Sequence, residues 1–363
     1  MPGAAERGCL VLADISGYSG YVVGSPLESA EDVVADVTET VVGRLEPVVR
    51  VNKLEGDAVF GYALDGEYDA TMLLDTIEEC YFAFRGRLRG IEHAVSCTCP
   101  ACAKVADLDL KFVVHHGEFV RRGAGRREEL TGHDVIVVHR LLKNSVAEAH
   151  GLHAYVLFTD ACLGALDLEP VSLGLRPHAE RYPDVGEVRA HVSDLEARWR
   201  EEQSRRRIRV GEGEADLLVE ALVPLPPEAA WELLTSPQKR LLWQVDTIEQ
   251  ADTGGRRHTG TSSVCVDGRT KIYEEILDWR PFEYVTERLS LPRNVRVVLT
   301  TAVEPRPDGT RVVALARRER AGRLAWAAES RRLRGRLEER YARLASLARA
   351  DIPAERRLPL AAV

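Results

Sequence analysis

The most constraining feature of this sequence is a highly charged stretch at residues 194–213, which separates two regions of ordinary globular character. It contains few apolar residues and carries three consecutive arginines at 205–207. Such a density of charge is typical of a solvated helix or a linker. The length of 363 residues also suits about two domains. We therefore expect domains at 1–193 and 214–350, a charged linker at 194–213 and a tail at 351–363.

The composition argues against several classes of protein. The formal net charge is −8, whereas proteins that bind nucleic-acid backbone need clustered cations. No apolar run reaches the roughly 18 residues of a membrane span, and the first residues lack the pattern of a secretory signal. The seven cysteines are odd in number and three of them crowd together, which is more typical of reduced thiols than of a secreted disulfide framework. We expect a cytoplasmic protein that neither spans a membrane nor binds nucleic acid.

The N-terminal region alternates between apolar runs and helical periodicity. Helical spacing of apolar residues predicts helices, which are expected at 29–45, 71–88 and 135–146. Short β-like runs predict strands, which are expected at 9–13, 48–53, 58–62, 108–115, 118–121 and 154–158. The two runs around His116-Gly117 are expected to form a hairpin that turns there. This order predicts an α+β domain with a mostly antiparallel sheet.

Two carboxylates follow the ends of expected strands in this region. Asp14 comes after the first strand and before a turn-rich segment that starts at Ser16-Gly17, and Asp57 lies at the tip of a hairpin. Carboxylates beside backbone N–H groups that can face phosphates are what a Mg²⁺–nucleotide site needs. Aspartate is also common at turns as a simple cap. The pair alone therefore leaves both interpretations open.

Taken in order, four segments of the N-terminal region resemble the catalytic domain of class III nucleotidyl cyclases. They are ADISGYS at 13–19, KLEGDAV at 53–59, VHHGE at 114–118 and GHDV from 132 onward, running to Arg140. The HHGE segment and the cysteine-rich insert are similar to a divergent branch of these cyclase-homology proteins. The resemblance covers about residues 7–193 and implies a ferredoxin-like fold that acts as a homodimer, because each class III site forms between two catalytic domains.

The resemblance implies how a nucleotide and its metal ions would be held. Asp14 and Asp57 match the two metal-binding aspartates, and the carbonyl of Ile15 would complete one metal site. Backbone groups of Ser16 and Gly17 would face the phosphates. ATP would then bind with Mg²⁺ or Mn²⁺ as the cofactor.

The resemblance also implies residues that read the base and stabilise the transition state. Lys53 matches the lysine that reads adenine, and Glu129 falls at the second base-reading position. Arg140 matches the transition-state arginine. Where the family has an asparagine that orients the ribose, this chain has Ile136, which forms no hydrogen bond. Two hypotheses follow: an adenylate cyclase that forms cyclic AMP, or a catalytically silent sensor that binds nucleotide or only dimerises and signals through a partner.

The cysteine-rich segment contains Cys97, Cys99 and Cys102. Three thiols at this spacing could fold around a structural Zn²⁺, which prefers four tetrahedral ligands. The candidates for a fourth ligand are His93, His115, His116 and Cys80. The alternatives are a loop of unligated thiols or a site that a partner completes.

The C-terminal region shows a strand, a short helix, several β-like runs and one long helix. The runs lie at 215–223, 229–234, 261–266, 271–277, 284–289, 295–303, 311–317 and 326–347. This order resembles the START-like or polyketide-cyclase-like helix-grip superfamily, in which a curved antiparallel sheet surrounds a long C-terminal helix. The resemblance implies a cavity for a hydrophobic small molecule or lipid, which would regulate the cyclase domain.

Four aromatic residues are candidates for the wall of that cavity: Trp243, Tyr273, Trp279 and Trp326. Each of them could instead simply fill the core. No nucleophile–base–acid set stands out in this region, so the sequence favours binding over catalysis here. An enzyme that acts on a hydrophobic substrate, with the N-terminal domain as its regulator, is the remaining alternative.

Overall fold

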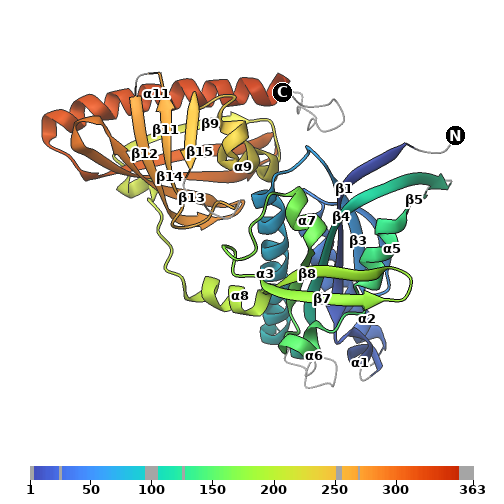
Figure 1. Ribbon diagram of the computed structural model, residues 1–363. Coiled ribbons are helices and arrows are strands. Elements are labelled where there is room, and N and C mark those ends of the chain that lie inside the picture. Colours follow the sequence, from blue (N-terminus) through green and yellow to red (C-terminus); the bar gives the residue numbers. More distant parts are fainter. Residues whose placement is uncertain are drawn as a thin grey trace. The chain divides into compact units, whose positions relative to one another are not determined.

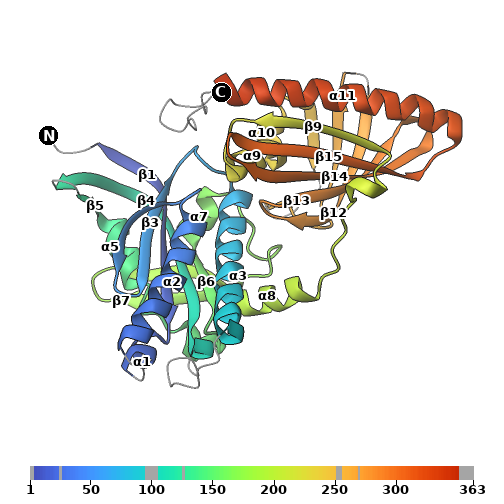
Figure 2. The same ribbon diagram turned by 180° about the vertical axis from the view of Figure 1, so that it is seen from behind.

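Each half of the chain builds its own β-sheet (Figures 1 and 2). The computed structural model describes residues 4–23, 27–94, 105–124, 127–250, 256–268 and 270–350. The chain divides into two units, Met1–Arg205 and Arg206–Val363. Both units combine helices with mostly antiparallel strands, which confirms the predicted α+β class. Within the described ranges, no helix is long and apolar enough to cross a membrane.

The sheet of the N-terminal unit has the strand order β2-β3-β1-β4-β6-β8-β7, with β5 paired to β4. Its strands are β1 (Ala5–Ser16), β2 (Arg50–Glu55), β3 (Ala58–Leu64), β4 (Asp109–Ala124), β5 (Arg127–Thr131), β6 (Tyr155–Thr159), β7 (Arg176–Tyr182) and β8 (Gly186–Asp194). Strands β4 and β6 run parallel, and the other pairs run antiparallel. Since β1 is buried on both faces, its run of valine and leucine fits a central strand.

Helices cover both faces of this sheet. Helices α2 (Leu27–Leu45) and α3 (Ala70–Ala94) share a core with Cys9 and Val11 of β1, whereas α5 (His133–Arg140) shares a core with Leu10. This alternation follows from the two-residue period of a strand. The shorter helices are α1 (Tyr18–Val23), α6 (Val146–His150), α7 (Asp160–Ala165) and α8 (Leu195–Ser204), with a 3-10 turn at Val105–Asp107.

The predicted hairpin at His116-Gly117 is wrong, because β4 continues through both residues. Gly117 lies opposite Gly8 of β1 in the antiparallel register. A Cβ atom on Gly117 would lie 2.2 Å from the carboxylate of Asp134. Residue 117 is therefore a glycine because Asp134 lies so close to it, and not because the chain turns there.

Two further segments differ from the sequence-based expectation. The helix expected at 135–146 ends at Arg140, and the Asn144 side chain then donates to the Leu141 carbonyl at 2.7 Å and accepts from the backbone N–H that starts α6. The charged segment is helical over α8, where Leu195 and Trp199 are buried in the N-terminal core. Part of the expected linker is thus a packed helix, capped by Asp194.

The sheet of the C-terminal unit is fully antiparallel, with the order β10-β11-β12-β13-β14-β15-β9. Its strands are β9 (Leu217–Val223), β10 (Thr247–Gln250), β11 (Ser262–Asp267), β12 (Thr270–Arg280), β13 (Tyr284–Leu291), β14 (Val295–Arg306) and β15 (Gly309–Arg320). Helix α11 (Arg323–Ala350) lies along this sheet and buries Leu333, Leu337, Tyr341 and Leu344 (Figure 1). Helices α9 (Pro227–Thr235) and α10 (Pro237–Arg240) complete the predicted helix-grip arrangement.

Candidate functional site

The structure places Asp14 and Asp57 side by side at one end of the N-terminal sheet. Asp14 is opposite Ala58 in the β1–β3 register, and Asp57 lies in the turn that joins β2 to β3. The backbone N–H of Ile15 donates to the carbonyl oxygen of Asp57 at 3.1 Å, which ties that turn to the end of β1. Burial raises the pKa of Asp57, and the negative charge of Asp14 raises it further. The fold therefore holds two carboxylates that repel each other.

Lys111 is the basic group of this site, and sequence reasoning missed it. It lies opposite Asp14 in the β1–β4 register, and its Nζ is 3.0 Å from Asp14 Oδ2. The two side chains are only 21% and 17% exposed. A lysine within the apolar run of residues 110–114 was the available signal, because an isolated charge in a buried run requires a partner.

This carboxylate pair fits a magnesium-type ion. Mg²⁺ is usually bound through one or two carboxylates together with waters and substrate phosphates. Among the described residues, no group of three or more His, Cys, Asp or Glu side chains could hold a metal by itself. A cation at Asp14 and Asp57 would therefore take its remaining ligands from a phosphate, from water or from backbone carbonyls such as that of Ile15.

The segment after Asp14 makes a tight turn. Gly17 has a φ of +84°, and a Cβ atom there would lie 2.7 Å from the Asp107 carbonyl oxygen. Only glycine combines this dihedral angle with so close an approach. Ser16 ends β1 opposite Asp109, so Ser16 and Gly17 lead the chain from the sheet into α1. Their expected contact with phosphates stays a prediction.

A second cluster surrounds Lys53. Its Nζ lies 2.5 Å from Glu55 Oε1, and His139 Nε2 of α5 lies 3.1 Å from Glu55 Oε2. Burial raises the pKa of Glu55, but the hydrogen bond from Lys53 and the charge of His139 outweigh it, so the net shift is downward. The Lys53 ammonium also lies 5.7 Å from the centre of the Phe60 ring. Glu55 and His139 were not foreseen as neighbours of the base-reading lysine.

The other residues carried over from the cyclase resemblance lie on the surface of this unit. Arg140 donates from Nη2 and Nε to Asp184 Oδ2 at 2.6 and 3.0 Å. Ile136, one helical turn earlier, is 51% exposed. Glu129 is exposed on β5 opposite Arg122. Helix α5 thus carries both Arg140 and the His139 that contacts the Lys53 cluster, while no described contact joins Glu129 to that cluster.

The possible zinc ligands Cys97, Cys99 and Cys102 lie outside the described residues, as does the side chain of His93. The other fourth-ligand candidates are buried and have partners within the N-terminal unit. His115 Nδ1 is 2.9 Å from Thr159 Oγ1, and His116 Nε2 is 2.9 Å from Asp65 Oδ1. Cys80 is fully buried, with its Sγ 3.7 Å from the Val41 carbonyl. A Zn²⁺ site therefore stays a prediction.

The four aromatic candidates of the C-terminal unit lie in different places. Trp243 is buried, with its ring 6.3 Å from that of Tyr341 on α11, whereas Trp279 packs against Trp231 at 5.1 Å. Trp326 is half-buried near the start of α11, 6.0 Å from the Arg318 guanidinium. Tyr273, in contrast, is 57% exposed, so it does not belong to an interior wall.

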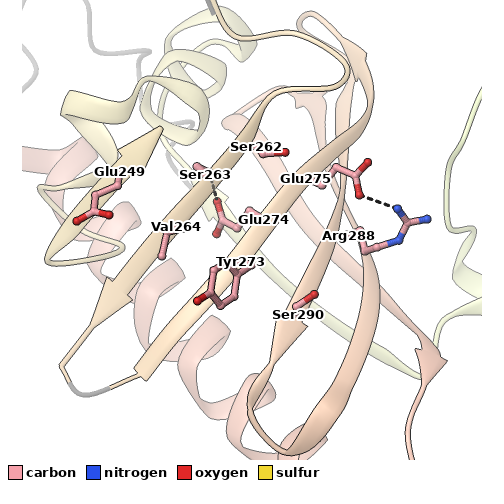
Figure 3. A pocket seen from close by; sticks show the side chains of 9 residues that line it. All are labelled: Glu249, Ser262, Ser263, Val264, Tyr273, Glu274, Glu275, Arg288 and Ser290. Atoms are coloured by element: carbon pink, nitrogen blue, oxygen red, sulfur yellow. Dashed lines mark hydrogen bonds and ion pairs between the residues drawn. The ribbon is translucent and has the colours of Figure 1, made fainter. Parts of the chain in front are cut away.

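Tyr273 instead lines an open pocket over strands β10 to β13, with a volume of about 340 Å³ (Figure 3). The ion pair between Glu275 and Arg288 belongs to the same pocket, with a distance of 2.7 Å between Glu275 Oε2 and Arg288 Nη1. Both of these side chains are substantially exposed. This pocket is therefore an open feature of the sheet surface, lined by charged side chains together with Val264 and Tyr273.

The interior of the C-terminal unit contains a smaller cavity of about 30 Å³, where α10 and α11 meet β13 and β14. It is lined by Leu234, Arg240, Trp243, Gln244, Val285, Glu287, Leu299, Thr301, Leu337, Arg340 and Tyr341. Of the four aromatic candidates, only Trp243 is in this wall. The wall is not purely apolar as expected, because buried arginine and glutamate side chains lie in it beside leucine and valine. Sequence reasoning missed these charged residues because it assigned charges to the surface.

Comparison with protein families gives two matches along the chain. Residues 34–150 match a family described as protein of unknown function (DUF2652). Residues 214–349 match the family described as polyketide cyclase / dehydrase and lipid transport, which confirms the predicted resemblance of the C-terminal region.

Individual relatives include an uncharacterized protein, Rv2561/Rv2562, of Mycobacterium tuberculosis, which is 33% identical over 162 residues, covering 45% of this chain and 73% of the relative. Similar solved structures include a bacterial light-regulated adenylyl cyclase, with 13% identity, a TM-score of 0.40 and coverage of 54% of this chain and 53% of that one. The adenylyl cyclase CyaB from P. aeruginosa is 15% identical with a TM-score of 0.41, over 58% of this chain and all of that one. The chain thus spans about half the length of the first of these structures. From these matches, the chain belongs to the family of the mycobacterial protein Rv2561/Rv2562, and its residues 214–349 are similar to the polyketide cyclase / dehydrase and lipid transport family.

Proposed function

We propose that the N-terminal unit binds ATP with two divalent cations, Mg²⁺ or Mn²⁺, at the interface of a homodimer and forms cyclic AMP. The observation that carries this proposal is the pair Asp14 and Asp57, which the β1–β3 register and the Ile15 hydrogen bond hold together. Burial and the negative charge of Asp14 together raise the pKa of Asp57, and a bound cation would relieve the repulsion between the two carboxylates.

Different residues of the chain would hold the metal ions, the adenine ring and the phosphate. When bound, the metal ions would supply activation of the ribose 3′-hydroxyl and stabilisation of charge on the α-phosphate, from which pyrophosphate leaves. Asp14 and Asp57 would hold them once Lys111 has moved away from Asp14. Lys53 would donate a hydrogen bond to the adenine ring. Arg140 would exchange Asp184 for the phosphate, as the fork of a guanidinium allows.

A catalytically silent sensor is the second candidate function, and the surface of α5 favours it. Ile136 offers no hydrogen bond to a ribose, and Arg140 is already bound by two hydrogen bonds to Asp184. In this case the unit would bind metal and nucleotide, or only dimerise, and would signal through a partner.

Cyclic nucleotide production from ATP and from GTP with Mn²⁺ separates the two functions. We expect cyclic AMP from the natural chain and none from Asp57→Ala, whereas Glu67→Ala, which removes an exposed carboxylate paired with Arg50, keeps full activity. No product together with metal-dependent ATP binding would favour the sensor. Neither product nor binding would refute a nucleotide site altogether.

For the C-terminal unit we propose binding of a hydrophobic small molecule or lipid that changes the rate of the N-terminal reaction. The match of residues 214–349 to a family that includes lipid transport supports this role. The test is a titration of the complete chain with candidate ligands while cyclic AMP formation is followed.

A further inference from the structure

We infer that the C-terminal unit docks on the surface of an anionic lipid membrane, through side chains at the start of β14, the end of β15 and the start of α11. We call this surface the arginine end, and it consists of Arg296, Arg318, Arg320, Arg323, Leu324 and Trp326. The inference depends neither on the proposed nucleotide site nor on the proposed ligand of this unit. The docking is peripheral, because no described helix could cross a membrane.

The arginine end has a strong local excess of positive charge. Residues 317–334 contain seven arginines and two glutamates, a formal charge of +5, whereas the whole chain has a charge of −8. Of the two glutamates, Glu319 is paired with Arg288, and Glu329 is fully buried. No described carboxylate forms an ion pair with the four arginines of this surface, which are Arg296, Arg318, Arg320 and Arg323.

Three of these arginines are exposed at positions where the fold does not favour positive charge. Arg296 of β14 lies directly opposite Arg320 of β15 in the antiparallel register, and like charges at opposed positions destabilise a strand pair. Arg323 begins α11, whose first turn contains no acidic residue, although the N-terminus of a helix favours negative charge. The chain by itself leaves these charges uncompensated, and an anionic surface would compensate them.

An apolar side chain projects from the same surface. Leu324 is 89% exposed, the largest value for any large hydrophobic side chain among the described residues. Trp326 is half-buried, and the Arg318 guanidinium lies over its ring at 6.0 Å from the centre. Leucine can enter the boundary between head groups and acyl chains, and tryptophan is typical of the membrane–water interface. Arginines beside such residues suit the head groups of anionic lipids.

This combination favours a membrane over a nucleic acid. Proteins that bind single-stranded nucleic acid combine cations with aromatic rings on which the bases stack. At the arginine end, Arg318 already lies over the ring of Trp326, and the most exposed apolar group is the aliphatic Leu324. An aliphatic side chain of this kind gains from burial in lipid and offers a base no stacking surface.

The test is co-sedimentation of the complete chain with phosphatidylcholine vesicles that contain about 30% phosphatidylserine, and with vesicles of phosphatidylcholine alone. At roughly 0.1 M salt we expect binding to the anionic vesicles only, and its loss at roughly 1 M salt. Arg320→Gln combined with Arg323→Gln should weaken this binding at least tenfold, since each arginine near the surface contributes about fivefold. The matched control, Arg306→Gln with Arg343→Gln, removes the same charge near the other ends of β14 and α11 and should bind like the natural chain.

Leu324→Gln distinguishes a membrane from a soluble polyanion, because it leaves every charge in place. It should weaken binding to the anionic vesicles several-fold, and an unchanged affinity would overturn the inference. Polyuridine RNA that binds through Arg320 and Arg323, with no binding to vesicles, would replace the membrane by a nucleic acid. Equal binding to both kinds of vesicle, binding to neither, or equal weakening by the two double variants would also overturn the inference.

Discussion

Both units hold carboxylates beside basic groups, but they differ in how those charges are buried and paired. In the N-terminal unit, one lysine serves two aspartates at a strand end, and the side chains of Lys111 and Asp14 are 21% and 17% exposed. In the C-terminal unit, the side chains of Arg240 and Glu274 are only 2% and 5% exposed and share two hydrogen bonds.

The two sites differ in whether their charged groups can exchange partners. The Lys111–Asp14 pair keeps some access to solvent, so Lys111 can leave Asp14 at a smaller cost than a fully buried pair would require. A buried pair cannot separate without leaving a charge in the interior. The N-terminal carboxylates are therefore available to a metal ion, whereas the C-terminal carboxylate is a fixed support that orients Arg240.

Glu274→Ala should give the largest effect, because it leaves the Arg240 guanidinium buried without its carboxylate. We expect the C-terminal unit to lose about 3–5 kcal/mol of unfolding free energy. Urea unfolding followed by tryptophan fluorescence measures this, since four of the five tryptophans lie in residues 206–363. The neighbouring Glu275→Ala breaks the exposed pair with Arg288 and should cost under about 1 kcal/mol. Equal losses in both variants would erase the distinction between buried and exposed charges.

Gly117→Ala should give the next largest effect, in the N-terminal unit. Asp134 accepts a hydrogen bond from the Glu118 N–H at 2.6 Å, and a methyl group on residue 117 would push its carboxylate away. We expect a loss of about 1–3 kcal/mol in urea unfolding followed by circular dichroism. Gly123→Ala on the same strand meets no atom within 4 Å and should be nearly neutral. If the two variants behave alike, the approach of Asp134 does not explain the glycine.

Lys111→Met should make the carboxylate pair a better metal site. Without the ammonium group, Asp14 has no competing cation 3.0 Å away. We expect Mn²⁺ to bind about two- to fivefold more tightly, the equivalent of roughly 0.4–1 kcal/mol for a partly exposed pair. Calorimetric Mn²⁺ titration measures the change. Weaker Mn²⁺ binding would mean that Lys111 supports the site and does not compete for it.

Asp57→Asn should give the smallest change in the free energy of unfolding, and this change should be a gain in stability. The folded-state pKa of Asp57 is raised by burial and by Asp14, above an unfolded value of about 3.9. Ionised Asp57 therefore opposes folding at neutral pH, and the variant should gain less than about 1 kcal/mol there. The gain should shrink as the pH falls through the folded pKa and vanish below about pH 4.

Asp134→Asn is the control for the pH dependence of Asp57→Asn, because it should change the free energy of unfolding in the opposite direction. Burial raises the pKa of Asp134, but hydrogen bonds from the Glu118 N–H, His115 and His133 outweigh it and lower the pKa. Its stabilising contribution is present above about pH 4 and is lost as the pH falls through the folded pKa. This variant should therefore be less stable at neutral pH. A shared sign for the two variants would contradict the assigned environments.

Apolar periodicity was enough to predict most of the core elements, because buried strands and helices carry it directly. Strands β1 and β3 and helices α3 and α11 fall where the sequence places them. The β7–β8 hairpin was missed because β7 has no buried residue and β8 buries only Ala190 and Val192, so neither strand carries a run of apolar residues.

The roles of several site residues could not be predicted from the sequence, because these roles depend on tertiary contacts. In the sequence, Gly117 indicates a turn. Only the structure shows that the Asp134 side chain lies where a Cβ atom on residue 117 would be. Lys111 and Glu274 are ordinary charges until the fold places Asp14 and Arg240 beside them. Sequence motifs could nominate Asp14 and Asp57, but the cations that face such carboxylates come from strands and helices that are distant in the chain.

A metal–nucleotide site at Asp14 and Asp57 is tested most directly by Mn²⁺ binding, followed by electron paramagnetic resonance with and without ATP. We expect saturable Mn²⁺ binding that ATP strengthens. This binding should be lost when Asp14→Asn and Asp57→Asn are combined, and it should be retained in Asp184→Asn, which alters the partner of Arg140. Identical Mn²⁺ titration curves for the natural chain and the double variant would contradict a metal–nucleotide site at these carboxylates.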